Sequence, residues 1–86
     1  MSPRKMVKPK KKKYSVVLFN DSINEYLYVV DVLKGIVGME LTQAENAANL
    51  AQRLGSYVIK SLDELQEAEA YVDLLLDCGL NIELHY

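Results

Sequence analysis

An Asn-Asp pair at the end of a predicted strand carries the side chains of this sequence that are best suited to binding. The strand covers residues 14–19, and Asn20 and Asp21 follow it directly, before a long helical pattern. An amide carbonyl and a carboxylate are both hydrogen-bond acceptors. Two neighbouring acceptors suit a donor-rich cation such as an ammonium group. The alternative is that Asn20 and Asp21 only form a turn and cap the next helix.

Residues suited to catalysis are scarce in the rest of the chain. With a single cysteine, Cys78, and a single histidine, His85, we expect no internal disulfide, zinc site or histidine-based triad. An enzyme would have to use Asp21, Cys78 or His85 as its base or nucleophile. Cys78 ends an apolar helical stripe and is better explained as a core residue. We therefore expect a protein that is not an enzyme and that needs no cofactor or metal.

The length and composition predict one small domain. The chain has 86 residues, half of them hydrophobic, which is too short for a second core. No apolar run approaches the roughly 20 residues that span a bilayer, and no apolar segment follows the basic start as in a signal peptide. We expect a cytoplasmic protein in a reducing compartment, without a membrane contact and monomeric.

The charges are divided sharply along the chain. Residues 1–13 contain seven of the ten basic residues and no acidic one, so we expect a disordered basic tail. Residues 14–86 contain three basic and all twelve acidic residues, a net charge of −9. Such an acidic surface is poorly suited to nucleic acid. We therefore expect a tail over residues 1–13 and a folded domain over residues 14–86.

The hydrophobic spacing predicts helices in the first two thirds of this domain. After the strand over 14–19, apolar residues at helical spacing predict a helix from about residue 24 to Gly38. Thr42 and Glu45 have the spacing of a capping box, which predicts a second helix over residues 43–54. Gly55 should end that helix.

The last third predicts a strand, a helix and a strand. The first strand covers residues 56–60, and Ser61 with Glu64 predicts a capped third helix that ends at Cys78. Residues 81–86 alternate in polarity, as a final strand does. The order β-α-α-β-α-β predicts an α+β fold with its helices on one face of a small sheet.

Several local motifs, taken together, resemble one family. They are Tyr-x-Val-Val-Leu-x-Asn-Asp over residues 14–21, Tyr-Val-Val-x-Val-Leu over 28–33, Val-Gly-Met over 37–39, Gln-Ala at 43–44 and Ala-Glu-x-x-Val over 68–72. They resemble ClpS, the adaptor that hands N-degron proteins to the AAA+ unfoldase of the Clp protease. The resemblance implies three helices on a three-stranded antiparallel sheet, similar to the C-terminal domain of the bacterial ribosomal stalk protein.

The resemblance also implies a binding site. In the family, the Asn-Asp pair and a histidine of the second helix hold the α-amino group of a peptide, and a hydrophobic pocket takes its bulky first side chain. Transferred to this sequence, the amine-binding residues are Asn20, Asp21 and Gln52. The pocket residues are Tyr26, Val29, Ala48 and Ala51. The implied partners are N-degron peptides or proteins and the N-terminal domain of a Clp AAA+ unfoldase.

The sequence departs from the family pattern at positions that matter for both partners. Gln52 stands in the place of the histidine, Tyr26 in the place of a gatekeeping methionine, and Ala48 and Ala51 replace larger wall residues. Tyr71 replaces a lysine that the family presents to the unfoldase. Two interpretations follow. The chain is an adaptor with altered specificity, or it is a ClpS-like scaffold that has lost N-degron binding and serves as a protein-interaction or regulatory module.

Overall fold

The computed structural model describes residues 13–86, so the expected basic tail lies outside the described residues except for Lys13. The elements along the chain are β1 (Tyr14–Phe19), α1 (Tyr26–Val32), the π-helical turn η1 (Leu33–Val37), α2 (Leu41–Leu54), β2 (Ser56–Leu62), α3 (Leu65–Asp77) and β3 (Ile82–His85). Within the described part, no helix is long and apolar enough to cross a membrane.

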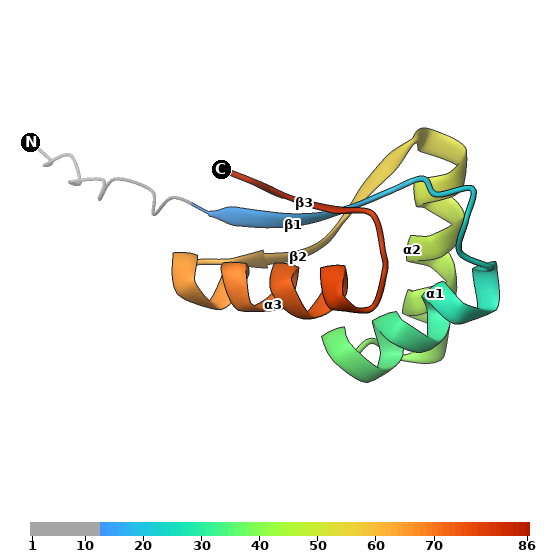
Figure 1. Ribbon diagram of the computed structural model, residues 1–86, viewed down its shortest axis with the longest axis horizontal. Coiled ribbons are helices and arrows are strands. Elements are labelled where there is room, and N and C mark those ends of the chain that lie inside the picture. The colour runs from blue at the N-terminus through green and yellow to red at the C-terminus, as the bar shows by residue number, and fades with distance from the viewer. Residues whose placement is uncertain (1–12) are drawn as a thin grey trace, which may run out of the picture.

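The sheet has three strands with β1 in the middle. The strand order is β2-β1-β3, and β1 is antiparallel to both neighbours. In this register Leu18 lies opposite Tyr57 on one side and Ile82 on the other. The expected antiparallel α+β fold is therefore confirmed. Figure 1 shows α3 running along the sheet, with α1 and α2 gathered beyond the end of β1.

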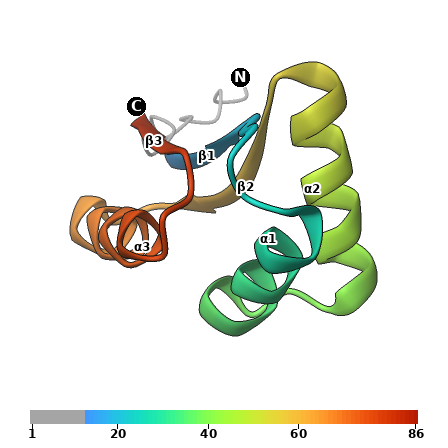
Figure 2. The same cartoon turned by 45° about the vertical axis from the view of Figure 1, so that its right-hand side comes forward.

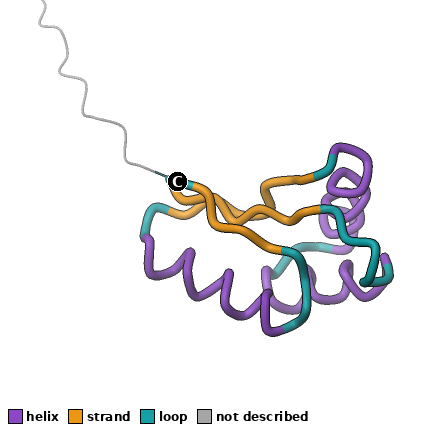
Figure 3. Tube along the Cα trace, turned by 45° about the horizontal axis from the view of Figure 1, so that its top comes forward, coloured by secondary structure: helices purple, strands orange, loops and turns teal. Residues whose placement is uncertain are grey.

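The helices cover one face of the sheet, as Figures 2 and 3 show. The core lies between them and is made of aliphatic side chains and alanines: Val16, Leu18, Val29, Val30, Val32, Leu33, Ala44, Ala47, Ala48, Ala51, Ile59, Ala68, Leu75, Leu80 and Ile82. The alternation of Val16 and Leu18 along β1 places both on the helix-covered face. No polar or charged side chain is buried among residues 13–86.

The first helix ends as its sequence predicts, but its last turn is wider than an α-helix. η1 follows α1 directly, and the backbone N–H groups of Gly38 and Met39 both donate to the carbonyl of Leu33. Gly38 has a φ of 86°, in the left-handed region that a side chain disfavours. Gly55, with a φ of 95°, ends α2.

The predicted helix starts were wrong in each case. α1 begins at Tyr26, with Glu25 as its N-cap residue, rather than near residue 24. For α2, the N-cap residue is Glu40 rather than Thr42, and the backbone N–H of Glu40 donates to Gln43 Oε1 at 3.4 Å. The predicted capping box of α2 is therefore present, but it is formed two residues earlier in the chain, by Glu40 and Gln43.

The third helix starts later than predicted because β2 is longer. Ser61 does not cap α3; it lies in β2, opposite Ser15, and Leu62 lies opposite Tyr14. Pairing with the first residues of β1 keeps this segment extended, so α3 begins at Leu65 with Glu64 as its N-cap residue. Beside this end of β2, Lys13 Nζ lies 3.3 Å from Asp63 Oδ1.

The packing predicts which leucines stabilise the domain. Leu33 is completely buried, whereas Leu27, on the same helical segment, is 69% exposed. Leu33→Ala should lower the free energy of unfolding by about 2–5 kcal/mol, because it removes apolar contacts and leaves a cavity. Leu27→Ala is the matched control and should change it by less than about 0.5 kcal/mol. Urea denaturation of both variants checks this; equal effects would contradict the described core.

Candidate functional site

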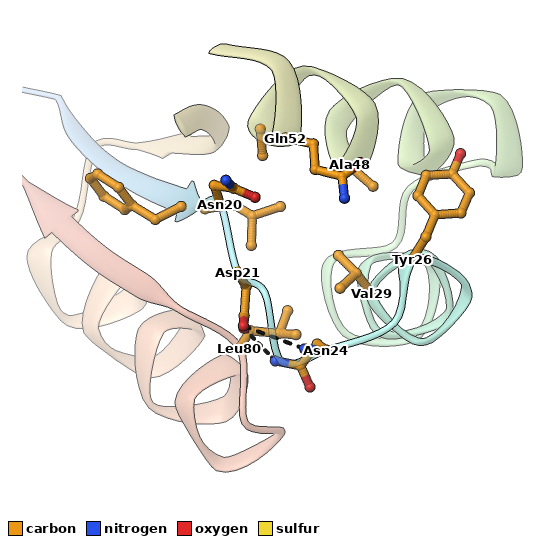
Figure 4. Close-up of a pocket in the computed structure, with 11 residues that line it drawn as sticks. Asn20, Asp21, Asn24, Tyr26, Val29, Ala48, Gln52 and Leu80 are labelled. Atoms are coloured by element: carbon orange, nitrogen blue, oxygen red, sulfur yellow. Dashed lines mark hydrogen bonds between the residues drawn. The ribbon is translucent and has the colours of Figure 1, made fainter. Parts of the chain in front are cut away.

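A pocket lies where β1 ends, between the turn that follows it, α1 and α2 (Figure 4). Its lining combines an apolar floor with a polar rim. The apolar residues are Leu18, Phe19, Val29, Ala48, Ala51 and Leu80, and the residues that carry polar groups are Asn20, Asp21, Asn24, Tyr26 and Gln52. Every site residue expected from the sequence is therefore brought to one pocket, although this does not test what they bind.

Hydrogen bonds of its backbone groups hold Asn20 in place, and its side chain is free to line the pocket. Its N–H donates to the carbonyl of Gly55 at 2.9 Å, and its carbonyl accepts from Asn81 Nδ2 at 3.3 Å. One partner follows α2 and the other precedes β3, so Asn20 is fixed from both sides. Figure 4 shows its amide group directed toward α2 and Gln52.

Asp21 is engaged in the turn that leads to α1. Its Oδ1 accepts from the Ile23 N–H at 2.7 Å and, more weakly, from the Asn24 N–H at 3.4 Å, while its Oδ2 accepts from Asn24 Nδ2. The Ile23 N–H and then the Asn24 amide hold the pKa of the Asp21 carboxyl below its usual value. In Figure 4 the carboxylate faces Asn24 rather than the amide of Asn20.

The start of α1 is tied to the turn between α3 and β3. Asn24 Nδ2 donates to the carbonyl of Gly79 at 2.8 Å, and the Tyr28 hydroxyl donates to the carbonyl of Cys78. The same turn continues into Leu80, which is 4% exposed and belongs to the apolar part of the pocket. Hydrogen bonds between residues 50 and 55 positions apart in the chain therefore hold the apolar floor and the polar rim of the pocket together.

The helix α2 supplies the opposite wall. Ala48 and Ala51 are buried, whereas the side chain of Gln52 is exposed and reaches toward the pocket. The Tyr26 hydroxyl lies 3.4 Å from the carbonyl of Glu45 and 3.5 Å from Asn49 Nδ2. Both distances are at the long end for hydrogen bonds, so the hydroxyl is bonded weakly, while the ring of Tyr26 packs against the core.

The pocket encloses little space beside its alanine wall. The space that it encloses is about 30 Å³, and the pocket is otherwise open to solvent. Ala48 and Ala51 replace larger wall residues of the family, which by itself would leave more room on this side. Small side chains also let two helices pack closely, and α1 and α2 do so here, with Val29, Ala48 and Ala51 all less than 9% exposed.

Sequence reasoning missed four lining residues of the site: Leu18, Phe19, Asn24 and Leu80. Leu18 and Phe19 were assigned only to the predicted strand. Asn24 was noted only as a helix-start residue, and Leu80 was not singled out. The polar position just before the helix was the available signal for Asn24, whereas Leu80 had none, because only tertiary packing brings it beneath Asp21. Cys78 and His85, the other residues weighed for chemistry, do not line this pocket.

Comparison with known proteins agrees with this fold. Residues 9–82 match the model of the family described as "ATP-dependent Clp protease adaptor protein ClpS". A solved structure, that of Agrobacterium tumefaciens ClpS2 bound to L-phenylalaninamide, superimposes with a TM-score of 0.72 at 26% sequence identity. The match covers 88% of this chain and 98% of that chain. No curated protein matches the sequence.

The fold and the pocket define a class of protein: small α+β domains with a partly polar pocket at the end of the central strand. The chain belongs to the ClpS family of ATP-dependent Clp protease adaptors. Its general role is therefore that of an adaptor to a Clp protease, and its partners are a Clp unfoldase and the substrates handed to it.

Proposed function

We propose that this chain binds the free N-terminus of protein substrates in the pocket at the end of β1 and delivers them to a Clp AAA+ unfoldase. The observation that carries the proposal is the convergence of Asn20, Asp21 and Gln52 on one pocket with an apolar floor. The ligand of the Agrobacterium protein, an amino-acid amide with an aromatic side chain, supports it.

The polar rim matches the chemistry of a peptide ammonium group. The ammonium group has three N–H donors, and Asn20 and Gln52 offer amide oxygens, while Asp21 offers a carboxylate. Only Asp21 supplies a negative charge, so the charge-assisted part of the binding depends on it. The low pKa of Asp21 keeps this charge present throughout the neutral and mildly acidic range.

The apolar floor suits the first side chain of the substrate. Leu18, Val29 and Leu80 are less than 9% exposed and present aliphatic surface to the pocket. The pocket is open on one side and encloses only about 30 Å³, so a leucine or phenylalanine side chain would be buried only in part as the pocket stands. We therefore propose that such a side chain displaces Tyr26, whose hydroxyl contacts are long.

The proposed unfoldase contact lies on α3. Tyr71 stands where the family resemblance implies a lysine, but Lys60 Nζ lies 5.3 Å from the centre of the Tyr71 ring. A hollow beside it is lined by Ile36, Lys60, Leu62, Glu67, Ala70, Tyr71 and Leu74. We propose that Lys60 of β2 supplies the positive charge that α3 lacks at this surface.

The test of the proposal is fluorescence anisotropy with short peptides that differ only in the first residue: Leu, Phe, Tyr, Trp, Arg or Ala. We expect binding that requires a free amine and a bulky first side chain, because the ammonium and the apolar contact both contribute. Asp21→Ala should weaken it by about ten- to a hundredfold, the effect of losing a hydrogen bond to a charged group. Asp31→Ala, which removes an exposed carboxylate elsewhere on α1, should not.

Three outcomes would count against this function. Unchanged affinity for an acetylated peptide would mean that the pocket is not an amine site. Flat, weak binding to every peptide would favour the ClpS-like scaffold that serves another protein contact. A loss of thermal stability in Asp21→Ala without a loss of peptide affinity would mean that Asp21 only forms the turn.

Gln52→His is expected to raise the affinity for free-amine peptides, since it restores the histidine that the family resemblance implies. A neutral imidazole nitrogen is a good acceptor for an ammonium N–H, and protonation abolishes that acceptor. The gain should therefore be larger at pH 8 than at pH 5.5. Peptide titrations of both proteins at the two pH values check this. A gain that does not depend on pH would show that the imidazole does not accept from the ammonium.

Lys60→Ala should weaken binding to the isolated N-terminal domain of a Clp unfoldase, because it removes the cation that lies over Tyr71. The expected loss is about two- to tenfold, as for a partly exposed charge. Lys34→Ala is the matched control, since Lys34 is an exposed lysine of η1 that does not line this hollow. Calorimetric titration checks this, and equal affinities of both variants would exclude a role for Lys60.

A further inference from the structure

The amide group of Asn24 connects two parts of the chain through its two hydrogens. Nδ2 donates to Asp21 Oδ2 and, at 2.8 Å, to the carbonyl of Gly79, which follows α3. Because both partners are acceptors, the orientation of the amide is fixed; exchange of its nitrogen and oxygen would place three acceptors together. Asn24 is thus the link between the carboxylate of the pocket and the turn before β3.

We propose that Asn24 is a positioning residue of the amine site: it holds the Asp21 carboxylate in place and anchors it to the backbone of Gly79. This inference rests on the proposed function, since it concerns how the same site is built. Asn24 acts through Asp21 and not on the ligand itself, because Figure 4 shows its amide oxygen directed away from the pocket.

The helix does not need Asn24 for its own start. α1 begins at Tyr26, its N-cap residue is Glu25, and no side chain caps it. The hydrogen bonds of the Asn24 side chain go to Asp21 and Gly79. These contacts exclude a role of Asn24 that is confined to helix capping. The role that they support is to attach the Asp21 carboxylate to the backbone of Gly79.

The carboxylate keeps acceptor capacity for a ligand after these contacts. Oδ1 accepts from the Ile23 N–H at 2.7 Å, and Oδ2 accepts from Asn24 Nδ2. An ionised carboxylate offers about four lone-pair sites, so an ammonium N–H can still approach. The Ile23 N–H and the Asn24 amide stabilise the ionised form, in that order, which lowers the pKa of Asp21.

Few other titratable groups lie on the segments around Asp21. Glu25 precedes α1, and Asp77 and Cys78 lie at the end of α3. The α2 residues of the pocket, Ala48, Ala51 and Gln52, do not titrate. None of the three titratable groups shares a hydrogen bond with Asp21, and Glu25→Gln controls for the nearest one in sequence.

Asn24→Ala should weaken binding of a free-amine Leu peptide about tenfold at pH 7, because the Asp21 carboxylate, no longer held by Asn24, keeps only part of its charge-assisted hydrogen bond to the ammonium group. It should also move the acid limit of binding to higher pH. The reason is that Asp21 without the Asn24 donor takes up its proton at higher pH and loses its charge earlier on acidification. Anisotropy titrations from pH 7 down to pH 3 measure both effects.

Two variants and one direct measurement make the test decisive. Ser22→Ala, in the same turn, and Glu25→Gln should keep the wild-type affinity and acid limit. Asn24→Asp keeps the shape of the side chain but replaces the donor by a second acceptor, so it should have at least the effect of Asn24→Ala. Carbon-13 NMR titration of the Asp21 carboxyl group, without peptide, should show a higher pKa in both Asn24 variants.

An unchanged Asp21 titration in the Asn24 variants would overturn the inference. So would weaker binding that follows a loss of thermal stability and leaves the acid limit where it is in the wild type. If the wild-type chain binds no free-amine peptide, the proposed function fails instead. The NMR titration then still decides whether Asn24 controls the charge of Asp21.

Discussion

The hydrogen bonding of β1 on both sides, up to and just beyond its last residue, is the constraint on which the site depends. β2 and β3 flank the strand, and the Phe19 N–H donates to the carbonyl of Asn81 at 2.8 Å, on the β3 side. The Asn20 N–H donates at 2.9 Å to Gly55, on the β2 side. A strand end fixed in this way can present two consecutive polar side chains without the freedom of a loop. The pocket then forms where α1 and α2 pack beside this strand end.

Turn formation and ligand binding are compatible roles for Asp21. The turn uses part of the acceptor capacity of the carboxylate, and the same bonds keep it ionised. A carboxylate free of such bonds would be more mobile and would lose its charge at higher pH. In the proposed amine site, the turn would therefore be a condition for binding, whereas the sequence alone set the two roles as alternatives.

Much of the fold could be predicted because it depends on local patterns. β1, the glycines that end the first two helices and the element order follow from residue types and spacing. The length of β2 could not, because Leu62 stays extended only through pairing with Tyr14. In the site, the resemblance named residues that lie together, but the Asn24–Gly79 bond joins positions 55 apart and belongs to tertiary structure.

The close packing of α1 and α2 affects how the binding free energy is divided between the ammonium group and the first side chain of a substrate. Burial of a large side chain contributes about 1.5–3 kcal/mol when the space already exists. Here the enclosed space is about 30 Å³ and the pocket is open on one side, so a large side chain stays partly exposed unless Tyr26 or the helices move. A polar contact with Asn20 or Asp21 requires at most a side-chain rotation, since the Asp21 carboxylate faces Asn24 rather than the amide of Asn20. It does not require the helices to separate. In this chain the ammonium group should therefore contribute more of the affinity, and the first side chain less, than in a site with a preformed hydrophobic pocket.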